Sequence, residues 1–373
     1  MAERRFIIEP RGVAPAWLKL LVPIASVAAA LLLGAVFLWL TGSNPWTVYT
    51  EMLDTAFGSS RGFSETLVSA TPLILTGVAA AIAFKMLVWN IGGEGQLLIG
   101  AIFAAGVAIL IGDGLPAVVA LPLVIMAGAV GGAVWASIAA VPRVYLGTNE
   151  IITTLMLNFI ALNLMNYLVF GSFSPWRDPE ATQFPQGRPI SDVARLPEFF
   201  NRLDWGFWIA VVVAIAAWLL LSKTGYGFQY RVVGDSSDTA RYAGIGVKQK
   251  ILSVFLMSGA SAGLAGSILV AGVLGRMDPR SLDLGLGFAG IIVAALARLN
   301  PLAVIPVAIL LGALRNAGPA LQAIGVPSEI AIMLEGAILL FAVAGEFLIA
   351  NRIRRPEREE PATPETLEAA STA

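Results

Sequence analysis

The segment Leu20-Leu-Val-Pro-Ile-Ala-Ser-Val-Ala-Ala-Ala-Leu-Leu-Leu-Gly-Ala-Val-Phe-Leu-Trp-Leu40 contains no charged residue. A membrane-spanning helix needs about 20 predominantly apolar residues, because the hydrocarbon core is about 30 Å thick and a helix rises about 1.5 Å per residue. This segment is therefore long enough to cross a bilayer, and we predict a transmembrane helix here.

Similar apolar segments recur along the rest of the chain. We predict an all-α fold, a polytopic membrane helical bundle of about ten transmembrane helices, in which residues 20–350 form one transmembrane domain. The predicted spans lie near residues 20–40, 66–86, 96–112, 116–141, 150–171, 205–222, 250–275, 284–299, 301–315 and 329–349.

The third predicted span is short and follows the run Asn90-Ile-Gly-Gly-Glu-Gly-Gln96. The eighth and ninth spans are also short. Glycines and polar side chains at the edge of an apolar segment favour broken or re-entrant backbone. Such backbone is tolerated at membrane depth only where protein buries it or where it lines a water-filled cavity.

The composition agrees with a membrane protein and argues against several other classes. The 373 residues are 57% hydrophobic and 13% charged, whereas soluble domains carry about 25% charged residues. The net charge of −1 gives no basic field for nucleic acid. With no Cys and no His, the chain lacks the commonest metal ligands and general base. We expect a transport protein in contact with lipid, without a metal site, and not an enzyme.

Ten spans place both termini on the same side of the membrane. If that side is the cytoplasm, all five lysines lie in the cytoplasm or at its interface, as the positive-inside rule requires: Lys19, Lys85, Lys223, Lys248 and Lys250. We therefore predict a cytoplasmic N-terminus at residues 1–19 and a disordered cytoplasmic tail at 351–373. Residues 172–204 then form a long outer loop, and residues 223–249 a cytoplasmic loop.

Glu94 is the most informative ionisable residue, because a carboxylate near the middle of the bilayer costs about 2.5–3.5 kcal/mol. One hypothesis is that Asn90, Glu94 and Gln96 border a solute path. The other is that Glu94 caps the third span by accepting hydrogen bonds from its free backbone N–H groups. The two roles are compatible, since helix breaks often lie beside transport paths.

The fifth predicted span is unusually polar. Thr154 and Asn158 share one helical face, as do Asn163 and Asn166. These side chains either line a pore or form hydrogen bonds between helices, which contribute roughly 0.6–2 kcal/mol each. In the tenth span, Glu335 is either a coupling acid or the partner of a neighbouring helix.

The glycine motifs indicate packing and not chemistry. The Gly128–Gly132 and Gly259–Gly263 pairs have the four-residue spacing that lets membrane helices approach closely. The run 285–290 matches the letters of a dinucleotide-binding fingerprint, but no strand precedes it, so we reject that function.

No phosphate-binding loop of the form Gly-x-x-x-x-Gly-Lys-Ser/Thr occurs in the sequence. If ATP drives this protein, another chain must bind it. The cytoplasmic loop would then receive the force, and its segment 234–245 has the Gly, Asp and Ser residues that begin a short helix at Ser237–Ala243. The residues predicted to couple to an ATPase are Gly234, Asp235, Ala240, Arg241, Gly244 and Ile245.

Three stretches resemble one family of transporters: 90–97 (NIGGEGQL), 148–158 (TNEIITTLMLN) and the 234–245 segment. The sequence is similar to permeases of ABC importers in the branched-chain amino acid/ribose/simple-sugar family, especially the nucleoside-type members, which also carry a segment like Phe184-Pro-Gln186. The resemblance covers roughly residues 20–350.

The resemblance implies a permease in a bacterial inner membrane that imports a nucleoside or a simple sugar by alternating access. It implies two ATPase subunits that hold ATP and Mg, a second permease that is a different chain, and an extracytoplasmic binding protein or lipoprotein. The alternatives are a proton- or sodium-coupled secondary transporter, for which Glu94 and Glu335 are the candidate acids, and an intramembrane enzyme.

Overall fold

The computed structural model describes residues 7–10, 15–171, 174–181 and 185–354. Ten helical segments in this part of the chain are long and apolar enough to cross a membrane. They are formed by α1 (Ala16–Leu40), α3 (Ser60–Phe84), α4 (Gly93–Ile111), α5 (Ala117–Leu146), α6 (Glu150–Phe170), α7 (Gly206–Lys223), α10 (Val247–Ile268) with the π-helix η2 (Leu269–Leu274), α11 (Pro279–Leu282) with α12 (Leu286–Leu296), α13 (Pro301–Ala323) and α14 (Glu329–Ala350).

The prediction of an all-α membrane bundle with ten spans is confirmed, and the differences concern boundaries. The ninth span was predicted to end at Arg315 but continues to Ala323, because a neighbouring carboxylate compensates the arginine inside the bundle. The eighth span is interrupted after four residues and resumes as the eleven-residue helix α12.

Several short elements complete the fold. They are α2 (Pro45–Phe57), α8 (Gly225–Asp235), α9 (Ser237–Tyr242), the 3₁₀ turn η1 (Asp192–Ala194) and four short strands, β1 (Ile7–Pro10), β2 (Glu198–Phe200), β3 (Leu203–Asp204) and β4 (Asn351–Arg354). Helix α2 was not predicted. Its start is nonetheless encoded locally, because the Asn44 side chain accepts a hydrogen bond from Trp46 N and Pro45 occupies the first helical position.

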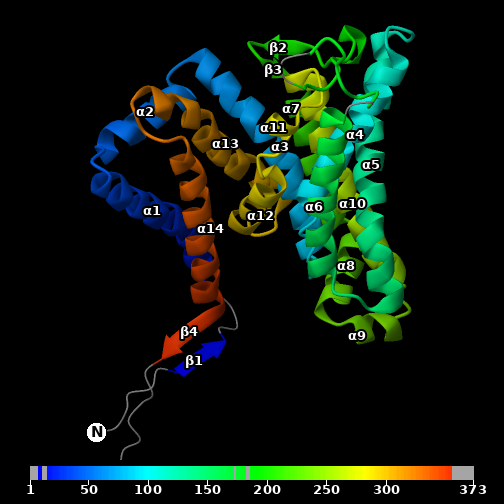
Figure 1. The fold of residues 1–373 in the computed structure, drawn as a ribbon. Coiled ribbons are helices and arrows are strands. Elements are labelled where there is room, and N and C mark those ends of the chain that lie inside the picture. Colours follow the sequence, from blue (N-terminus) through cyan, green and yellow to red (C-terminus); the bar gives the residue numbers. More distant parts are fainter. Residues whose placement is uncertain (1–6, 11–14, 172–173, 182–184, 355–373) are drawn as a thin grey trace, which may run out of the picture.

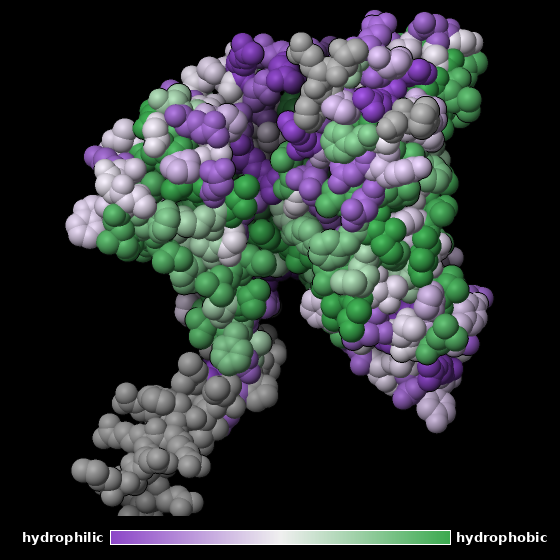
Figure 2. All heavy atoms as spheres, in the orientation of Figure 1, coloured by the Kyte–Doolittle hydropathy of each residue, from purple (hydrophilic) through white to green (hydrophobic). Residues whose placement is uncertain are grey.

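Helix α3 lies between two groups of helices (Figure 1). Its most apolar window is 94% buried, against 22% for the peripheral α1. On one side α3 contacts α13 and α2, and on the other it contacts α10 and α7, with α12 also packed against it. Apolar residues cover much of the middle of the molecule, and hydrophilic residues gather towards its ends (Figure 2), as expected for a helical membrane protein.

The predicted close packing at the glycine pairs is confirmed, and the two pairs face each other. A Cβ added to Gly132 would lie 2.2 Å from the carbonyl oxygen of Gly259, and one added to Gly263 would lie 2.2 Å from that of Gly128. Helix α4 joins the contact, because a Cβ on Gly100 would lie 2.3 Å from the Gly263 oxygen. Helices α4, α5 and α10 therefore touch backbone to backbone.

The two ends of the described chain meet on one face of the bundle. Strand β1 pairs antiparallel with β4, with Ile7 opposite Arg354, and α8 and α9 lie at the same end of the molecule (Figure 1). We call this the termini face. The long loop with β2 and β3 lies at the opposite end, the long-loop face. Residues 351–354 of the tail predicted to be disordered thus form a strand, while residues 355–373 lie outside the described part.

Candidate functional site

Non-helical backbone separates α3 from α4 over residues 85–92, and protein surrounds much of it. Leu87 has a positive φ of 56°, and Asn90 and Gly92 are buried. The break was predicted at 90–96. In the structure it ends earlier, so Glu94 and Gln96 belong to the first turn of α4. We call residues 85–92 the first break.

Two amide side chains tie the first break to α4. Asn90 Nδ2 donates to Gln96 Oε1 (3.1 Å), and Gln96 Nε2 donates to Asn90 Oδ1 (2.9 Å). Asn90 Nδ2 also donates to Ser258 Oγ (2.9 Å), whose hydroxyl donates to the Ala79 carbonyl of α3 (2.8 Å). The buried side chains of Asn90, Gln96 and Ser258 thereby have hydrogen-bond partners, which avoids the desolvation penalty that an unpaired group would carry.

Helix α6 holds the same break from the other side. Asn158 Oδ1 accepts from Gly95 N (2.8 Å), and its Nδ2 donates to the Ile91 carbonyl (2.9 Å). Thr154 Oγ1 accepts from Ile91 N (3.3 Å). Thr154 and Asn158, two of the buried polar residues of α6, therefore supply hydrogen bonds to the non-helical backbone at Ile91.

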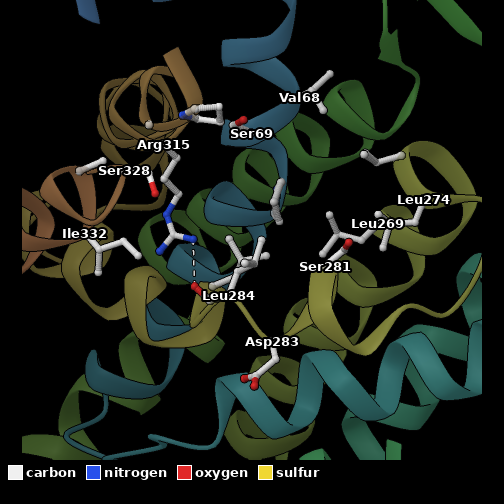
Figure 3. Close-up of a pocket in the computed structure, with 16 residues that line it drawn as sticks. Val68, Ser69, Leu269, Leu274, Ser281, Asp283, Leu284, Arg315, Ser328 and Ile332 are labelled. Atoms are coloured by element: carbon white, nitrogen blue, oxygen red, sulfur yellow. Dashed lines mark hydrogen bonds between the residues drawn. The ribbon is translucent and has the colours of Figure 1, made fainter. Parts of the chain in front are cut away.

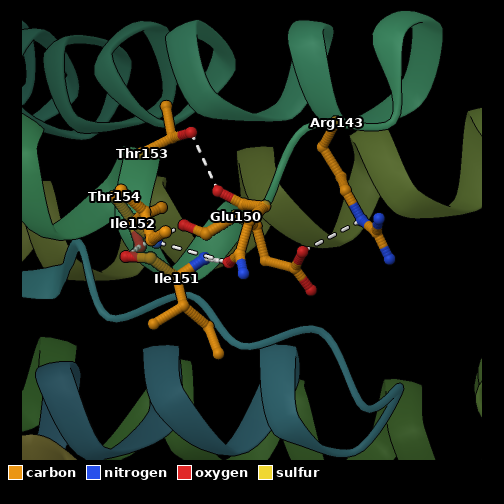
Figure 4. Close-up of polar contacts among 7 residues, drawn as sticks. Arg143, Glu150, Ile151, Ile152, Thr153 and Thr154 are labelled. Atoms are coloured by element: carbon orange, nitrogen blue, oxygen red, sulfur yellow. Dashed lines mark hydrogen bonds and ion pairs between the residues drawn. The ribbon is translucent and has the colours of Figure 1, made fainter.

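The start of α6 is fixed by two side chains (Figure 4). Asn149 caps the helix by accepting from Ile151 N (2.9 Å), and the buried Glu150 forms an ion pair with Arg143 of α5 (3.0 Å). Thr154 Oγ1 donates to the Glu150 carbonyl (2.6 Å). These contacts set the position of Thr154 and Asn158 relative to the break.

Asn163 and Asn166 do not join this network. Asn163 is exposed and donates only to the Phe159 carbonyl of its own helix (2.8 Å) in the described contacts. Asn166 is partly exposed on the same region of α6. Of the seven residues predicted to border a solute path, five are thus brought together around the first break and two lie on an open face.

We expect Asn158→Ala to lower the stability of the permease, because it leaves the Gly95 N–H and the Ile91 C=O without their partner. Losing the partner of a buried backbone group costs about 1–3 kcal/mol. Asn163→Ala is the matched control and should change stability by less than about 0.5 kcal/mol. Thermal unfolding of the detergent-solubilised protein measures both. Equal effects would contradict the assigned role of Asn158.

Glu94 caps a helix, but not the one that was predicted. Its two carboxylate oxygens accept hydrogen bonds from Gly285 N (3.1 Å) and Gly287 N (2.6 Å), at the start of α12. The interpretation that Glu94 caps its own span is therefore wrong. A carboxylate in this position neutralises the positive end of the α12 dipole, and Gly285 adopts a positive φ of 66° there. We call residues 283–287 the second break; they comprise the non-helical residues 283–285 and the first two residues of α12.

A cavity of about 540 Å³ lies against the second break (Figure 3). Its walls come from α3, η2, α11, α13 and α14, and are mostly apolar. It lies in the half of the molecule nearer the long-loop face, because it reaches the α13–α14 connection at Ser328. The polar side chains that line it are Ser69, Ser281, Asp283, Arg315 and Ser328. We call this space the vestibule.

Arg315 connects the vestibule to the second break. Its Nε and Nη2 bind both oxygens of the buried Glu335 (2.7 and 2.8 Å), and its Nη1 donates to the Leu284 carbonyl (3.1 Å). Glu335 is thus the partner of a neighbouring helix, one of its two predicted roles. Arg315 was missed as a site residue because it was taken to mark the end of a span. An arginine and a glutamate inside two consecutive apolar segments are the signal that could have revealed the pair.

On the termini face, α9 lies close to its predicted bounds, ending at Tyr242 instead of Ala243. Ala240 is buried, and Ile245 N donates to its carbonyl (2.9 Å). Arg241 pairs with Asp238 (2.9 Å), and Tyr242 is 95% exposed. One side of α9 is therefore anchored to the bundle, and the other is free to meet another molecule.

The residues around α9 also meet the first break. A cavity of about 620 Å³ lies between them, lined by Met86, Val88, Gly234, Asp235 and other residues. A Cβ added to Gly234 would lie 3.0 Å from the backbone of Met86. Gly244 turns the chain with a positive φ of 73°. The predicted coupling residues are thus grouped at the termini end of the first break.

Ten apolar helical segments in the described part of the chain, with two helix breaks and a cavity among them, are the features of a polytopic membrane transport protein. The chain belongs to the family of permease components of branched-chain amino acid transport systems, whose family model matches residues 62–343.

Curated relatives support this membership. The chain is 35% identical to the glucose ABC transporter permease protein TsgB13 of Haloferax volcanii, covering 93% of both chains. It is 33% identical to the nucleoside permease NupB of Lactococcus lactis subsp. cremoris, over 89% of this chain and 92% of the relative. It is also 33% identical to the guanosine permease NupP of Bacillus subtilis, over 88% and 94%. The protein is accordingly the permease subunit of an ABC transporter and not an enzyme, and these relatives do not support a secondary transporter.

Proposed function

We propose that this permease imports a nucleoside, or alternatively a simple sugar, and that the vestibule is the entry to its solute path. Support comes from the solutes in the names of its relatives and from the vestibule itself. Its volume of about 540 Å³ falls in the range of roughly 300–1,000 Å³ that small-molecule sites occupy.

The lining of the vestibule suits such a solute. Asp283 and the three serines can exchange hydrogen bonds with sugar hydroxyls, and Leu269, Leu284 and Ile332 offer an apolar surface. A nucleoside combines a hydroxyl-bearing ribose with a flat base, so it can use both kinds of surface. The single observation that carries the proposal is this cavity, which ends on a helix break held by Arg315.

Below the vestibule, the path would pass the second break and the residues around the first. In this proposal Asn90, Glu94, Gln96, Thr154 and Asn158 form its wall. Asn163 and Asn166 extend the path along the open face of α6, because exposed amides in an apolar span need water or a polar partner. That face would meet a second, different permease, so that two chains enclose the path.

The termini face would be cytoplasmic, in the bacterial inner membrane, and α8 and α9 would dock the ATPase. The lysines favour this orientation, and without a phosphate-binding loop in this chain, ATP and Mg must be bound by partner subunits. Gly234, Asp235, Ala240, Arg241, Gly244 and Ile245 would shape the docking surface. An extracytoplasmic binding protein or lipoprotein would deliver the solute to the long-loop face.

The test is uptake of radiolabelled guanosine and glucose by proteoliposomes that contain the complete transporter. We expect uptake of one of them that requires the ATPase subunits and ATP. Concentrative uptake without the ATPase would contradict the proposal. So would uptake driven by a proton gradient alone.

Because the chain has no Cys, a single thiol can report on the vestibule. We expect a membrane-impermeant maleimide to modify Ser69→Cys from the long-loop face, to block uptake, and to react several-fold more slowly in the presence of the transported solute. Asp192→Cys is the control: this exposed site lies outside the vestibule, so its reaction rate should not depend on solute. Solute-independent reaction of Ser69→Cys with normal uptake would exclude the vestibule from the path.

A further inference from the structure

The start of α4, which directly follows the first break, packs against the start of α12 in the second break. A Cβ added to Gly287 would lie 2.1 Å from Glu94 N, and one added to Gly93 would lie 3.6 Å from the Gly287 carbonyl oxygen. Only glycine allows this approach at position 287, because the atom in the way is backbone. The starts of the two helices are therefore packed against each other and are constrained to move together.

Opposite charges hold the second break from two sides. Glu94 accepts from the N–H groups of Gly285 and Gly287, and Arg315 donates to the Leu284 carbonyl. Arg315 is itself held by both oxygens of Glu335. Leu284 and Leu286, on the same short turn, line the vestibule. The position of these two walls thus depends on Glu94 and Arg315.

The first break also contacts α8, on the side of the termini face. Its Met86 touches Gly234 at the end of α8, and the amide pair of Asn90 and Gln96 fixes the break to the first turn of α4. Glu94 lies in that same turn. An unbroken series of contacts therefore runs from α8, through the first break and Glu94, to the wall of the vestibule.

We propose that the contact of Glu94 with the second break, which we call the latch, transmits movement of α8 and α9 to that break and so opens and closes the vestibule. This inference rests on the proposed function, in which α8 and α9 receive the force of the ATPase. Packed side chains and hydrogen-bonded networks carry coupling between distant sites when the connected elements have two arrangements. Glu94 is a positioning residue here: it moves the wall and need not touch the solute.

The chemistry of the latch requires a carboxylate. Both oxygens accept from backbone N–H groups at once, and the negative charge faces the positive end of α12. A glutamine of the same size has one acceptor oxygen, and its NH₂ group would face a backbone N–H. Glu94→Gln should therefore release the second break from α4 while leaving the size of the side chain unchanged.

The experiment uses the complete transporter in proteoliposomes, with Ser69→Cys in the permease as the reporter. The rate of modification by a charged maleimide is compared between the nucleotide-free and the vanadate-trapped states. With Glu94 present, we expect the two rates to differ by at least about fivefold, the lower range of allosteric coupling. With Glu94→Gln, the difference should fall below about twofold, while ATP hydrolysis continues without uptake.

Asp204→Asn is the matched control. Asp204, in β3 just before the span α7, is also a buried carboxylate that accepts from a backbone N–H, that of Gly206 (2.7 Å), but it does not join the two breaks. Burial raises the pKa of Asp204 to about 6, so the assay is run at a pH well above that value to keep it ionised. The control should retain the nucleotide-dependent difference.

The possible results of this experiment distinguish failure of the latch from failure of the proposed function. If Glu94→Gln retains the full difference in modification rates, the latch is refuted while the proposed function stands. If the unaltered Glu94 background shows no ATP-dependent uptake and no difference in rates, the proposed function fails and the latch with it. If the transporter with Glu94→Gln does not assemble, the same two modification rates are measured with Glu94→Asp. Aspartate keeps the charge, but its side chain is one methylene shorter and should no longer reach Gly285 N and Gly287 N together. The difference in rates should therefore shrink, and an undiminished difference would refute the latch.

Discussion

Gly263→Ala should prevent stable folding of the permease, whereas Gly336→Ala should be tolerated. The added Cβ at Gly263 would lie 2.2 Å from the carbonyl oxygen of Gly128 and 2.9 Å from the Cα of Gly132. Both are backbone atoms, so relief requires α5 and α10 to separate. Overpacking typically costs about 1–3 kcal/mol, and we expect about 3 kcal/mol or more here, because a whole helix pair must shift.

Gly336 is the matched control because it lies within α14 with nothing within 4 Å of an added Cβ. There the substitution should be neutral or slightly stabilising, since alanine is favoured over glycine within a helix by up to about 1 kcal/mol. Yield after membrane extraction and the midpoint of thermal unfolding measure both variants. If Gly263→Ala extracted and unfolded like Gly336→Ala, the close approach of α5 and α10 would be contradicted.

The glycine contact shows why much of the fold could be predicted from sequence. Span length and the absence of charge follow from the thickness of the bilayer, so ten segments could be recognised one at a time. The four-residue spacing at Gly128 and Gly259 is likewise local. It predicts that a helix packs closely, although only the structure shows that these two pairs pack on each other.

The features that escaped prediction depend on partners far apart in the sequence. Glu94 binds the N-cap residue of α12, Gly285, which lies 191 residues later in the chain, so no local pattern could distinguish this role from capping its own span. Arg315 lies within a span because Glu335 compensates it, and without that partner its charge reasonably suggested an end. Helix α2 is too short to be detected as a span, although its cap is a local signal.

The polar residues of α6 illustrate the same limit. Asn158 and Asn163 have identical side chains on one helix. The first satisfies the backbone of the first break, and the second bonds only within its own helix among the described contacts. Composition indicated that this span is polar, but which of its faces meets α4 is set by packing between α4 and α6. The sequence therefore identified the right helix without separating its two faces.

The two carboxylates that could have served a proton-coupled transporter are both engaged in structural contacts. Glu335 binds Arg315 through two hydrogen bonds, and Glu94 binds two backbone N–H groups. A coupling acid must exchange its proton at each transport cycle, which would break these contacts every time. Their hydrogen bonds instead hold the second break in place, in agreement with an ABC permease that takes its energy from a partner.

Arg315→Met should destabilise the permease strongly and abolish uptake. The substitution leaves Glu335 buried without its partner, and removing one member of a buried ion pair costs about 3–5 kcal/mol. It also removes the donor to the Leu284 carbonyl at the second break. We expect a large drop in extractable protein and in the midpoint of thermal unfolding, together with loss of guanosine or glucose uptake in proteoliposomes.

The double variant Arg315→Met with Glu335→Leu separates stability from function. Replacing both members by apolar residues removes the unpaired charge, so most of the stability should return, as it does for other buried pairs that are replaced together. Uptake should remain low, because Leu284 still lacks its donor and the wall of the vestibule is no longer held. A double variant as unstable as Arg315→Met would show that the pair is not the source of the effect. Full uptake in a stable double variant would show that the Arg315 contact with the second break is dispensable for transport.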